Sequence, residues 1–584
     1  MRLLKEDSSM IKMILKKLSE LAILDCCLIL SSASPAFALS YHFDAVDGND
    51  ANDCTAPERA CKTIEKANQQ QYNFGDKILF RGGQTFQGSL ELNPEKVLDD
   101  PGTPFDGGPA LLEITSYSVG GLRENAKIQG SSGIGVTDIG QVRIHDIDLA
   151  GTSLTNGGIG IAFFNGSGRA VEHISIGPNV SASGFGLGLQ IFANDLESTI
   201  RTVRIDGLEV SYNGEGGMGI YGAPNILSGT QTGPRSVEDV VIRNAKVNYN
   251  KGAGILNGGY GASLFGIANL LIENNELIGN GGEGPGANSA ALFGFHNLKV
   301  TIRKNRIYYT SFSGDPATGA NSDGNGINLR GSGLSIYENE IVGNQGSCIL
   351  VDGGGHPSLD EGGTTEDLEF FNNLCLYNGA GDPETYFEGR DVQASFRVFY
   401  SAKKVKAYNN LFVVAGSVEE GVGGVFEINR WRPDGAISDI KFLNNLVVVA
   451  RGNVPFVQIR FPEDNERIQI TGNNYFNPEG ASKFENCRPY CTEIFNTLQE
   501  FREGTGHEML DGLPVGRSED AYVALWGENT GRIPAYSPVI GAGVDLNRFD
   551  VAPPETDFFG NPRNGHFTIG AHEPGASDPP PGGG

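Results

Sequence analysis

Arginine, carboxylate and amide side chains recur at every second position of several short apolar runs in the second half of the chain. Such alternation is typical of strands, which direct successive side chains to opposite faces, so the polar set should point outward from a core. The outward set consists of Asn328, Arg330, Asp352, Arg397, Glu427 and Asn429, and Gln458 and Arg460 continue it. Guanidinium groups bind carboxylates and hydroxyls, and carboxylates can donate or accept protons. If the strands lie side by side, the sequence predicts a polar surface that can bind and catalyse.

Three segments between the runs, residues 353–367, 379–393 and 429–435, should wall this surface as a groove. Long loops on a rigid scaffold commonly carry function. The predicted catalytic residues are Arg330, Asp352, His356, Arg397 and Glu427. The predicted ligand contacts are Asn328, Tyr400, Asn429, Arg430, Trp431 and Arg460. Trp431 stands between two arginines, and an exposed aromatic ring in such a loop is typical of binding sites.

An internal repeat indicates which elements position these groups. The segments LLIENNEL, VTIRKNRI, LSIYENEI, LEFFNNLC, VKAYNNLF, IKFLNNLV and IQITGNNY align on one asparagine column: Asn275, Asn305, Asn339, Asn373, Asn410, Asn445 and Asn473. Successive members are 28 to 37 residues apart, a period that indicates a solenoid. Asparagine suits a corner because it tolerates left-handed backbone angles, and stacked amides could bond one another in an internal ladder.

The repeat predicts an all-β, right-handed parallel β-helix of about eleven coils. Helical repeats of similar period are excluded because the apolar residues alternate over short β-branched runs. We expect residues 39–127 to form an N-terminal cap with the first coils, and the amphipathic stretch 61–71 to be a helix that covers the open end. Residues 128–476 should form the β-helix, 477–573 a C-terminal capping region and 574–584 a Pro/Gly-rich tail.

The N-terminal 38 residues are typical of an export signal. Lys16 and Lys17 precede the apolar run Leu21–Leu30, and Ala36-Phe37-Ala38 supplies the small-x-small cleavage pattern. No later run has the length of a membrane span. We therefore expect a secreted protein.

Six cysteines follow this signal. Close spacing in an oxidising compartment predicts disulfides for two pairs, Cys54/Cys61 and Cys487/Cys491. Cys348 and Cys375 lie nine and two residues after their corner asparagines. Those offsets should place them at different angles around the solenoid, so we expect two unlinked, buried residues.

Net charge and the remaining polar residues narrow the range of ligands. A formal charge of −26 argues against nucleic acid, which requires a basic footprint. No cofactor or metal site is assigned, although Ca2+ is left open because Asp47, Asn49, Asp50 and Asp53 form an acidic turn without EF-hand spacing. The scattered histidines His145, His173 and His296 are expected to be structural or surface residues.

A resemblance can be stated on three stretches: YHFDAVDGNDAND with CKTIEKAN and FGDKILFRGGQTFQGSL, the NN-x-apolar coils, and SPVIGAG with DFFGNPR and IGAHE. Together they resemble bacterial secreted proteins of the pectate-lyase-like β-helix superfamily, over about residues 41–573. The resemblance implies an enzyme that degrades polysaccharides. Asn321-Ser322-Asp323-Gly324, NQGSC and GGGH are similar to polygalacturonase motifs, but Gly346 and Ser347 replace the paired aspartates, which argues against that mechanism.

Three functions remain open. A lyase acting on a uronate polysaccharide needs cations and a base, roles that Arg330, Arg397 and His356 could divide. An inverting glycoside hydrolase needs two separated carboxylates, and Asp352 and Glu427 should lie two coils, or about 9–10 Å, apart. A non-catalytic surface or adhesion protein is the third alternative. The lyase is preferred, acting as a monomer on a polysaccharide.

Overall fold

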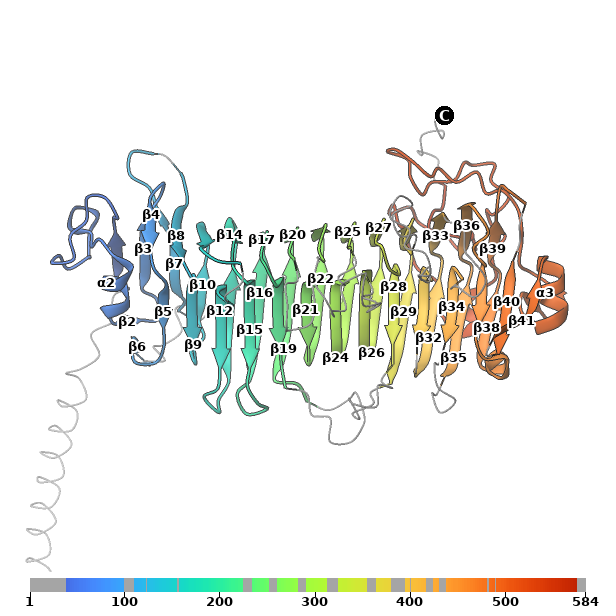
Figure 1. Cartoon of the computed structure of the whole chain (residues 1–584), viewed down its shortest axis with the longest axis horizontal. Coiled ribbons are helices and arrows are strands. Elements are labelled where there is room, and N and C mark those ends of the chain that lie inside the picture. The colour runs from blue at the N-terminus through green and yellow to red at the C-terminus, as the bar shows by residue number, and fades with distance from the viewer. Residues whose placement is uncertain are drawn as a thin grey trace, which may run out of the picture.

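The structure is a computed structural model that describes residues 38–574 apart from 99–109, 122, 155–156, 224–233, 252–259, 282–289, 312–323, 354–363, 380–393, 400, 416–423, 430–436, 481–482 and 489. The chain winds into a parallel β-helix with three faces, as the sequence predicts, and Figure 1 shows the strands side by side along one rod. Each coil passes from face 3 to face 1, then to face 2 and back to face 3. Among the described residues, no helix is long and apolar enough to cross a membrane.

Face 1 is a stack of short parallel strands that will carry the candidate site. It contains β5 Leu90–Leu92, β9 Ile134–Thr137, β12 Ile159–Asn165, β15 Leu187–Ala193, β18 Gly216–Tyr221, β21 Tyr260–Phe265, the first parts of β24 Ala290–Arg303 and β26 Asn325–Tyr337, β28 Ile349–Asp352, β31 Phe396–Phe399, β34 Phe426–Asn429, β37 Val457–Ile459 and β40 Phe484–Arg488.

Face 2 joins face 1 where β24 and β26 run continuously around the corner. Its other strands are β1 Ser40–Phe43, β3 Lys77–Arg81, β7 Leu112–Tyr117, β10 Val142–Ile144, β13 Val171–Ile176, β16 Ile200–Asp206, β19 Val237–Arg243, β22 Ile267–Glu273, β29 Thr365–Phe371, β32 Ala402–Tyr408, β35 Ile437–Leu443 and β38 Ile468–Thr471.

Face 3 is a separate parallel sheet. It consists of β4 Thr85–Gln87, β8 Ala126–Gly130, β11 Ile147–Gly151, β14 Val180–Ser183, β17 Leu208–Ser211, β20 Lys246–Asn248, β23 Glu276–Ile278, β25 Arg306–Tyr308, β27 Glu340–Val342, β30 Leu374–Leu376, β33 Leu411–Ala415, β36 Leu446–Arg451 and β39 Asn474–Phe476. The remaining elements are α2 Ile64–Gln69, α3 Leu498–Thr505, the 3-10 helices Pro57–Arg59, Pro462–Arg467 and Leu546–Phe549, and the strands β2 Tyr72–Asn73, β6 Val97–Leu98, β41 Tyr490–Phe495, β42 Met509–Leu510 and β43 Leu513–Pro514.

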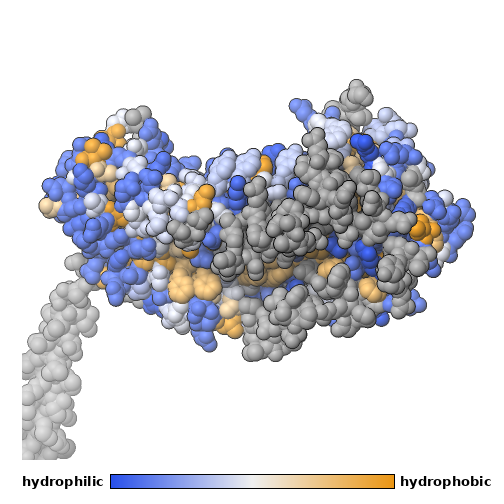
Figure 2. All heavy atoms as spheres, viewed as in Figure 1, coloured by the Kyte–Doolittle hydropathy of each residue, from blue (hydrophilic) through white to orange (hydrophobic). Residues whose placement is uncertain are grey.

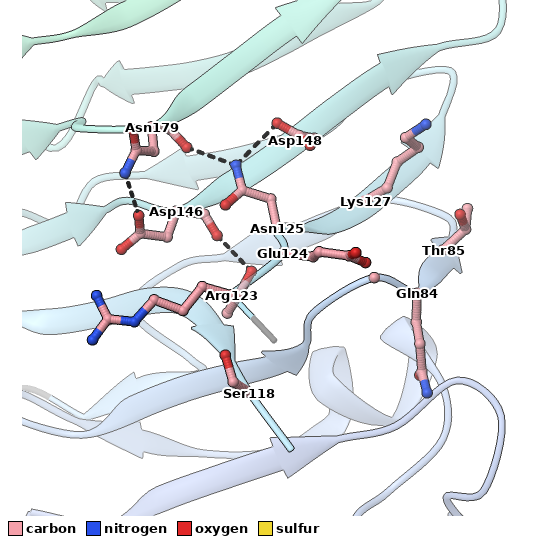
Figure 3. Close-up of a pocket in the computed structure, with 12 residues that line it drawn as sticks. Gln84, Thr85, Ser118, Arg123, Glu124, Asn125, Lys127, Asp146, Asp148 and Asn179 are labelled. Carbon is pink, nitrogen blue, oxygen red and sulfur yellow. Dashed lines mark hydrogen bonds between the residues drawn. The ribbon is translucent and has the colours of Figure 1, made fainter. Parts of the chain in front are cut away.

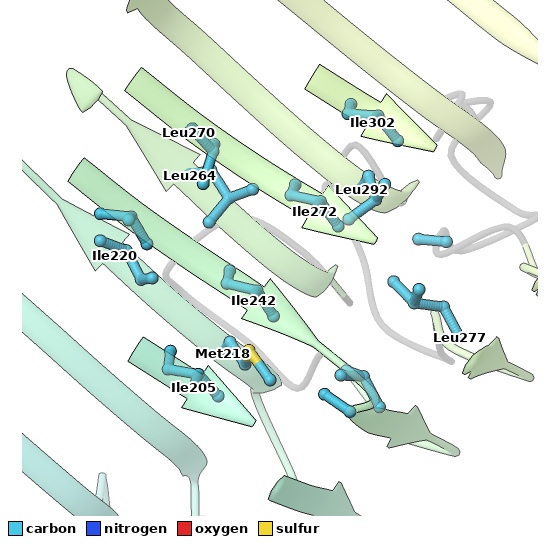
Figure 4. Close-up of a cluster of buried hydrophobic side chains, with 14 of the residues drawn as sticks. Ile205, Met218, Ile220, Ile242, Leu264, Leu270, Ile272, Leu277, Leu292 and Ile302 are labelled. Atoms are coloured by element: carbon cyan, nitrogen blue, oxygen red, sulfur yellow. The ribbon is translucent and has the colours of Figure 1, made fainter. Parts of the chain in front are cut away.

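Inward side chains of all three faces form one continuous apolar core along the rod. Figure 4 shows Ile220, Leu264 and Leu292 of face 1 packing with side chains of neighbouring faces. The alternation that the sequence predicts is confirmed where Ile327, Leu329, Ile349, Val351, Phe396, Val398, Phe426 and Ile428 all belong to this core.

The asparagine ladder is confirmed at the corner between faces 2 and 3. From Asn275 to Asn473, each side-chain Nδ2 donates to the Oδ1 of the next member at 2.9–3.1 Å. The ladder ends on Glu508, whose Oε1 accepts from Asn473 Nδ2 at 2.7 Å. All members are buried, so each amide satisfies backbone groups that would otherwise lose their hydrogen bonds.

A second ladder, which the sequence reading missed, lies at the corner between faces 3 and 1. Asn213 donates to Asn250 and Asn250 to Asn280, each at 3.0 Å. Asn344 donates to Asn378 at 2.7 Å, and Thr310 takes the position between Asn280 and Asn344. The signal was a second asparagine five residues after the first, as in ENEIVGN.

The segment that follows α3 returns along the outside of the last coils. Figure 1 shows it above β33, β36 and β39. Its apolar residues pack on outward side chains of face 3 such as Leu374, Leu411 and Leu446. The first asparagine of the Asn-Asn pairs anchors it, since Asn409 donates to the carbonyl of Thr568 and Asn444 to that of Val544, both at 2.8 Å.

Two disulfides lie among the described cysteines. Cys54 and Cys61 are bonded, as predicted. The prediction that Cys348 and Cys375 are not bonded is wrong: they form a disulfide, with their Cα atoms 5.7 Å apart. Cys348 directly precedes strand β28 of face 1 and Cys375 lies in strand β30 of face 3, so they do differ in angle, but both side chains are buried in the same core. Cys487 and Cys491 are backbone partners in the β40–β41 hairpin, and their side chains lie outside the described residues.

Candidate functional site

Parallel pairing arranges the predicted residues of face 1 in two outward columns. The first column contains Asn328, Leu350, Arg397, Glu427, Gln458 and Glu485. The second, two residues further along each strand, places Asp352, Phe399 and Asn429 opposite one another. Asp352 is therefore not in register with Arg397, although its strand and that of Glu427 are separated by one strand, as expected.

Glu427 is the centre of the charged groups in the first column. Its Oε2 lies 3.1 Å from Nε of Arg397 in the preceding coil. Its Oε1 accepts from Nε of Arg460 in the next coil at 3.1 Å and from Asn429 Nδ2 at 3.3 Å. The structure thus brings together four of the predicted residues, and both carboxylate oxygens are engaged.

The side chains around Glu427 are more buried than side chains that line an open groove would be. The side chain of Glu427 is 1% exposed, and those of Arg397 and Arg460 are 19% and 24% exposed. Asn328 and Arg330 are also buried. A buried carboxylate requires paired charges, and two guanidinium groups supply them here.

The charged column continues beyond the residues that were predicted. Glu485 accepts from Gln458 Nε2 at 2.7 Å and forms an ion pair with Lys483 at 2.5 Å. Glu485 follows Gln458 in the register, so the alternation in FENCR after the run VQI was a signal that could have identified it.

Arg330 lies in a different setting from Arg397, because it belongs to the second column and to a strand two coils earlier, with β28 between the two strands. Its guanidinium lies 4.4 Å from the centre of the Phe295 ring, which favours a cation–π contact. His296 lies in the electrostatic field of Arg330 and Arg235, and burial together with these cations lowers the pKa of His296 to about 4. A neutral imidazole beside two guanidinium groups was not expected at this position.

Aromatic side chains occupy the second column N-terminal to Arg330. Phe164 pairs with Phe192, and Tyr221 with Phe265, which in turn pairs with Phe295. The rings of Phe164 and Phe192 are stacked with their centres 5.6 Å apart. We call Phe164, Phe192, Tyr221, Phe265 and Phe295 the aromatic strip. Figure 2 shows a hydrophobic patch over the ends of β12 and β15, so this part of the aromatic strip reaches the surface.

Four predicted site residues lie outside the described part of the chain: His356, Tyr400, Arg430 and Trp431. Asp352 is placed by its backbone alone, at the end of β28. The roles assigned to these five residues stay predictions.

A pocket of about 880 Å³ lies at the other end of the rod, between face 3 and its corner with face 2. Figure 3 shows Asp146 and Asp148 beside Asn125 and Asn179. Asp148 accepts hydrogen bonds from Asn125 and Ser181, and Asp146 accepts from Asn179. These carboxylates hold neighbouring coils together, which makes them poor candidates for acid–base chemistry.

His145 has a structural setting next to this pocket. Its Nδ1 and Nε2 lie 2.6 Å from carboxylate oxygens of Asp146 and Glu113. The bond to Glu113 raises the pKa of His145, and the same bond lowers the pKa of Glu113 to about 2. Within the described residues, no three His, Cys, Asp or Glu side chains are grouped to hold a metal ion.

The acidic turn considered for calcium has other partners. Asp50 accepts from the backbone of Lys62 and Thr63, and Asp53 forms an ion pair with Arg59 at 2.6 Å. These carboxylates therefore serve the loop before α2.

Comparison with known proteins gives similarities of fold only. No protein-family model matches the chain, and no curated protein matches it. Among solved structures, it is similar to the GH136 lacto-N-biosidase from Eubacterium ramulus, with 12% identity, a TM-score of 0.39 and coverage of 72% of this chain and 67% of that one. XylC in complex with xylose gives 11% identity, a TM-score of 0.33 and coverage of 91% and 98%.

Pectate lyase Pel9A is a third similar structure, with 11% identity, a TM-score of 0.28 and coverage of 92% of this chain and 97% of that one. Superpositions this loose assign neither a reaction nor a substrate. The function of this β-helix protein must therefore be inferred from its own residues.

Proposed function

We propose that this protein is a secreted enzyme that cleaves a uronate-containing polysaccharide by β-elimination on face 1. The observation that carries the proposal is the pairing of Glu427 with Arg397 and Arg460 across three adjacent coils. Secretion is supported by the signal-like sequence of residues 1–38 and by two disulfides, which persist in oxidising compartments.

The contacts of Glu427 favour a lyase over a hydrolase. A hydrolase would need this carboxyl group to protonate a leaving oxygen or to activate water. Both oxygens are instead held by guanidinium and amide donors, so Glu427 acts as a positioning residue for Arg397 and Arg460. Positioned guanidinium groups are what a developing enolate-like charge on a uronate carboxyl requires.

The elimination itself needs one proton acceptor. The base removes the proton alpha to the uronate carboxyl, the electron pair forms a carbon–carbon double bond, and the bond to the leaving sugar oxygen breaks. That oxygen takes up a proton from the protonated base or from water, which gives a free hydroxyl. His356 is our first assignment for this role, and it follows Asp352, the last residue of β28, by four residues in the sequence. His296 is the alternative, because its neutral imidazole lies in the field of Arg330.

An inverting glycoside hydrolase is the second candidate, because the distance between the strands of Asp352 and Glu427 fits its mechanism. The strands of Asp352 and Glu427 are separated by one strand, which corresponds to about 9–10 Å between backbones and falls near the range for inversion. This mechanism would require Glu427 to release one of its arginines.

One experiment separates the candidates. The purified full chain is incubated with polygalacturonate, alginate and xylan, and the ultraviolet absorbance of unsaturated uronate is measured together with new reducing ends. A lyase gives both signals, and a hydrolase gives reducing ends alone. Loss of activity in Arg397→Ala, with activity kept in Arg243→Ala, an exposed arginine of face 2, would support the assigned site. Absence of both signals on all three polymers would contradict an enzyme of this class and favour an adhesion protein.

A further inference from the structure

A row of tyrosines lies on the corner between faces 3 and 1, at the opposite ends of the face 1 strands from Tyr221 and Asp352. Extending the face 3 register by one residue gives the column Gly184, Tyr212, Tyr249, Gly279, Tyr309, Gly343 and Tyr377. We call its four aromatic members, Tyr212, Tyr249, Tyr309 and Tyr377, the tyrosine row.

Every position of this column has a left-handed backbone. The four tyrosines have φ between +55° and +57°, and Gly279 and Gly343 have +61° and +62°. A residue with a side chain pays about 1 kcal/mol or more for this conformation, whereas glycine does not. The corner between faces 2 and 3 has the same backbone demand and fills it with polar residues such as Asn274, Lys304 and Glu338. The backbone therefore gives no reason for tyrosine.

Packing in the core does not explain the tyrosines either, because three of them are exposed. Tyr212, Tyr249 and Tyr309 are 63%, 46% and 60% exposed. The rings of Tyr212 and Tyr249 lie nearly parallel with their centres 5.4 Å apart. Large aromatic groups that are both exposed and held in a costly backbone conformation are typical of functional surfaces.

The glycines of the column make room for the rings. A Cβ added to Gly279 would lie 2.7 Å from the ring of Tyr249, and one added to Gly343 would lie 2.8 Å from that of Tyr309. The rings of Tyr249 and Tyr309 therefore lie over the glycine of the next coil. At the C-terminal end, Tyr377 stacks on Trp526 with ring centres 4.6 Å apart, and Trp526 is itself 74% exposed.

We propose that the tyrosine row binds a linear polysaccharide that runs along the rod, outside the candidate active site. The rings repeat with the coil spacing of about 4.8 Å or its multiples, which suits a chain of repeating rings. A tyrosine offers an apolar ring for a pyranose face and a hydroxyl for its oxygens. The row is only one residue wide because the buried ladder of Asn213, Asn250 and Asn280 runs directly beside it. A stable protein partner would need a contiguous patch of about 800 Å². A row one residue wide suits a narrow polysaccharide chain better than a protein surface.

The test measures binding and does not depend on the proposed reaction. The full chain is run through native gels that contain polygalacturonate, alginate or xylan, and its retardation is compared with that of a triple variant, Tyr212→Gly/Tyr249→Gly/Tyr309→Gly. We expect wild type to be retarded by at least one polymer and the variant to bind it at least about tenfold more weakly. Glycine relieves the backbone at each site, so the Tm should stay the same or rise.

A matched control is Tyr522→Gly, since Tyr522 is also exposed and has φ of +54° but lies outside the row. It should bind like wild type. Equal retardation of wild type and the triple variant, or no retardation of wild type in any gel, would overturn the proposal. A Tm lowered by the three glycines would identify the rings as structural and would also overturn it. Because binding is measured separately from turnover, failure of the lyase assignment would leave this result unaffected.

Discussion

Face 1 carries two different surfaces on one uniform scaffold. Before β26, its second outward column holds aromatic rings from Phe164 to Phe295. From β26 onward, most outward positions hold arginines, carboxylates and amides, with Leu350 and Phe399 as exceptions, and Glu427 is ion-paired on both sides. The strands, their pairing and the apolar core beneath are the same in both halves. The chemistry of this face is therefore set by the outward positions alone.

The interior also differs between the halves. The asparagine ladder runs from Asn275 to Asn473, and the Cys348–Cys375 disulfide lies within the same coils. The ion-paired half of face 1 thus lies over most of this ladder and over the disulfide, whereas the coils of the aromatic half contain its first members and the ladder of Asn213, Asn250 and Asn280. A rigid support of this kind keeps positioned charges in place, which is what electrostatic catalysis requires.

The largest expected effect concerns the ion-paired half. Arg397→Ala should lower kcat/KM by about 10²-fold or more, because a positioned cation is lost from the transition state. Arg460 would still pair with Glu427, so the fold should be kept. Steady-state kinetics on the polymer identified above, with Arg243→Ala as control, checks this. A loss confined to KM would indicate that Arg397 only binds substrate.

The second effect concerns the internal support. Asn373→Leu should destabilise the protein by about 2–3 kcal/mol, because Asn373 bonds Asn410 and the carbonyl of Ile336 in a buried corner. Thermal unfolding measures it, with the exposed Asn547→Leu as control. An unchanged Tm would mean that the ladder adds no net stability to the coils that carry the charges.

The sequence alone was sufficient to predict the features that recur with the repeat. The ladder and the outward parity of Arg397 and Glu427 are both consequences of spacing, and both are confirmed. The Cys348–Cys375 disulfide was missed because the angular offset of two inward residues does not determine the distance between them in the core.

Features that depend on local packing were also missed. The register shift between Gly294 and Asn297 gives His296 a left-handed backbone at the corner, and periodicity cannot indicate such an irregularity. The burial of Glu427 depends on side chains from three coils, which no single repeat encodes.

A smaller effect is expected in the aromatic half. Phe192→Ala should raise KM for long polymers about three- to tenfold and leave kcat unchanged, because one ring of the stacked pair with Phe164 is lost from a binding surface. Short oligosaccharides that do not reach β15 should be unaffected. Equal KM values for wild type and variant on long polymers would restrict the substrate to the ion-paired half.

The smallest effect should be a pH-dependent one at the N-terminal end, in the contact of His145 with Glu113. The pKa of His145 is raised in the folded protein, so its contribution to stability is full below about 6.5 and is lost as pH rises through the folded pKa. The pKa of Glu113 is lowered to about 2, so its contribution is full above about 4.5 and is lost as pH falls through 2. The two conditions overlap between about pH 4.5 and 6.5.

Within this pH range, His145→Gln should reduce stability by about 1 kcal/mol, and by less at pH 8.5. Thermal unfolding of both proteins at pH 5.5 and 8.5 measures the difference. A deficit that is the same at both pH values would mean that the neutral imidazole holds Glu113 by hydrogen bonding alone, without an ion pair.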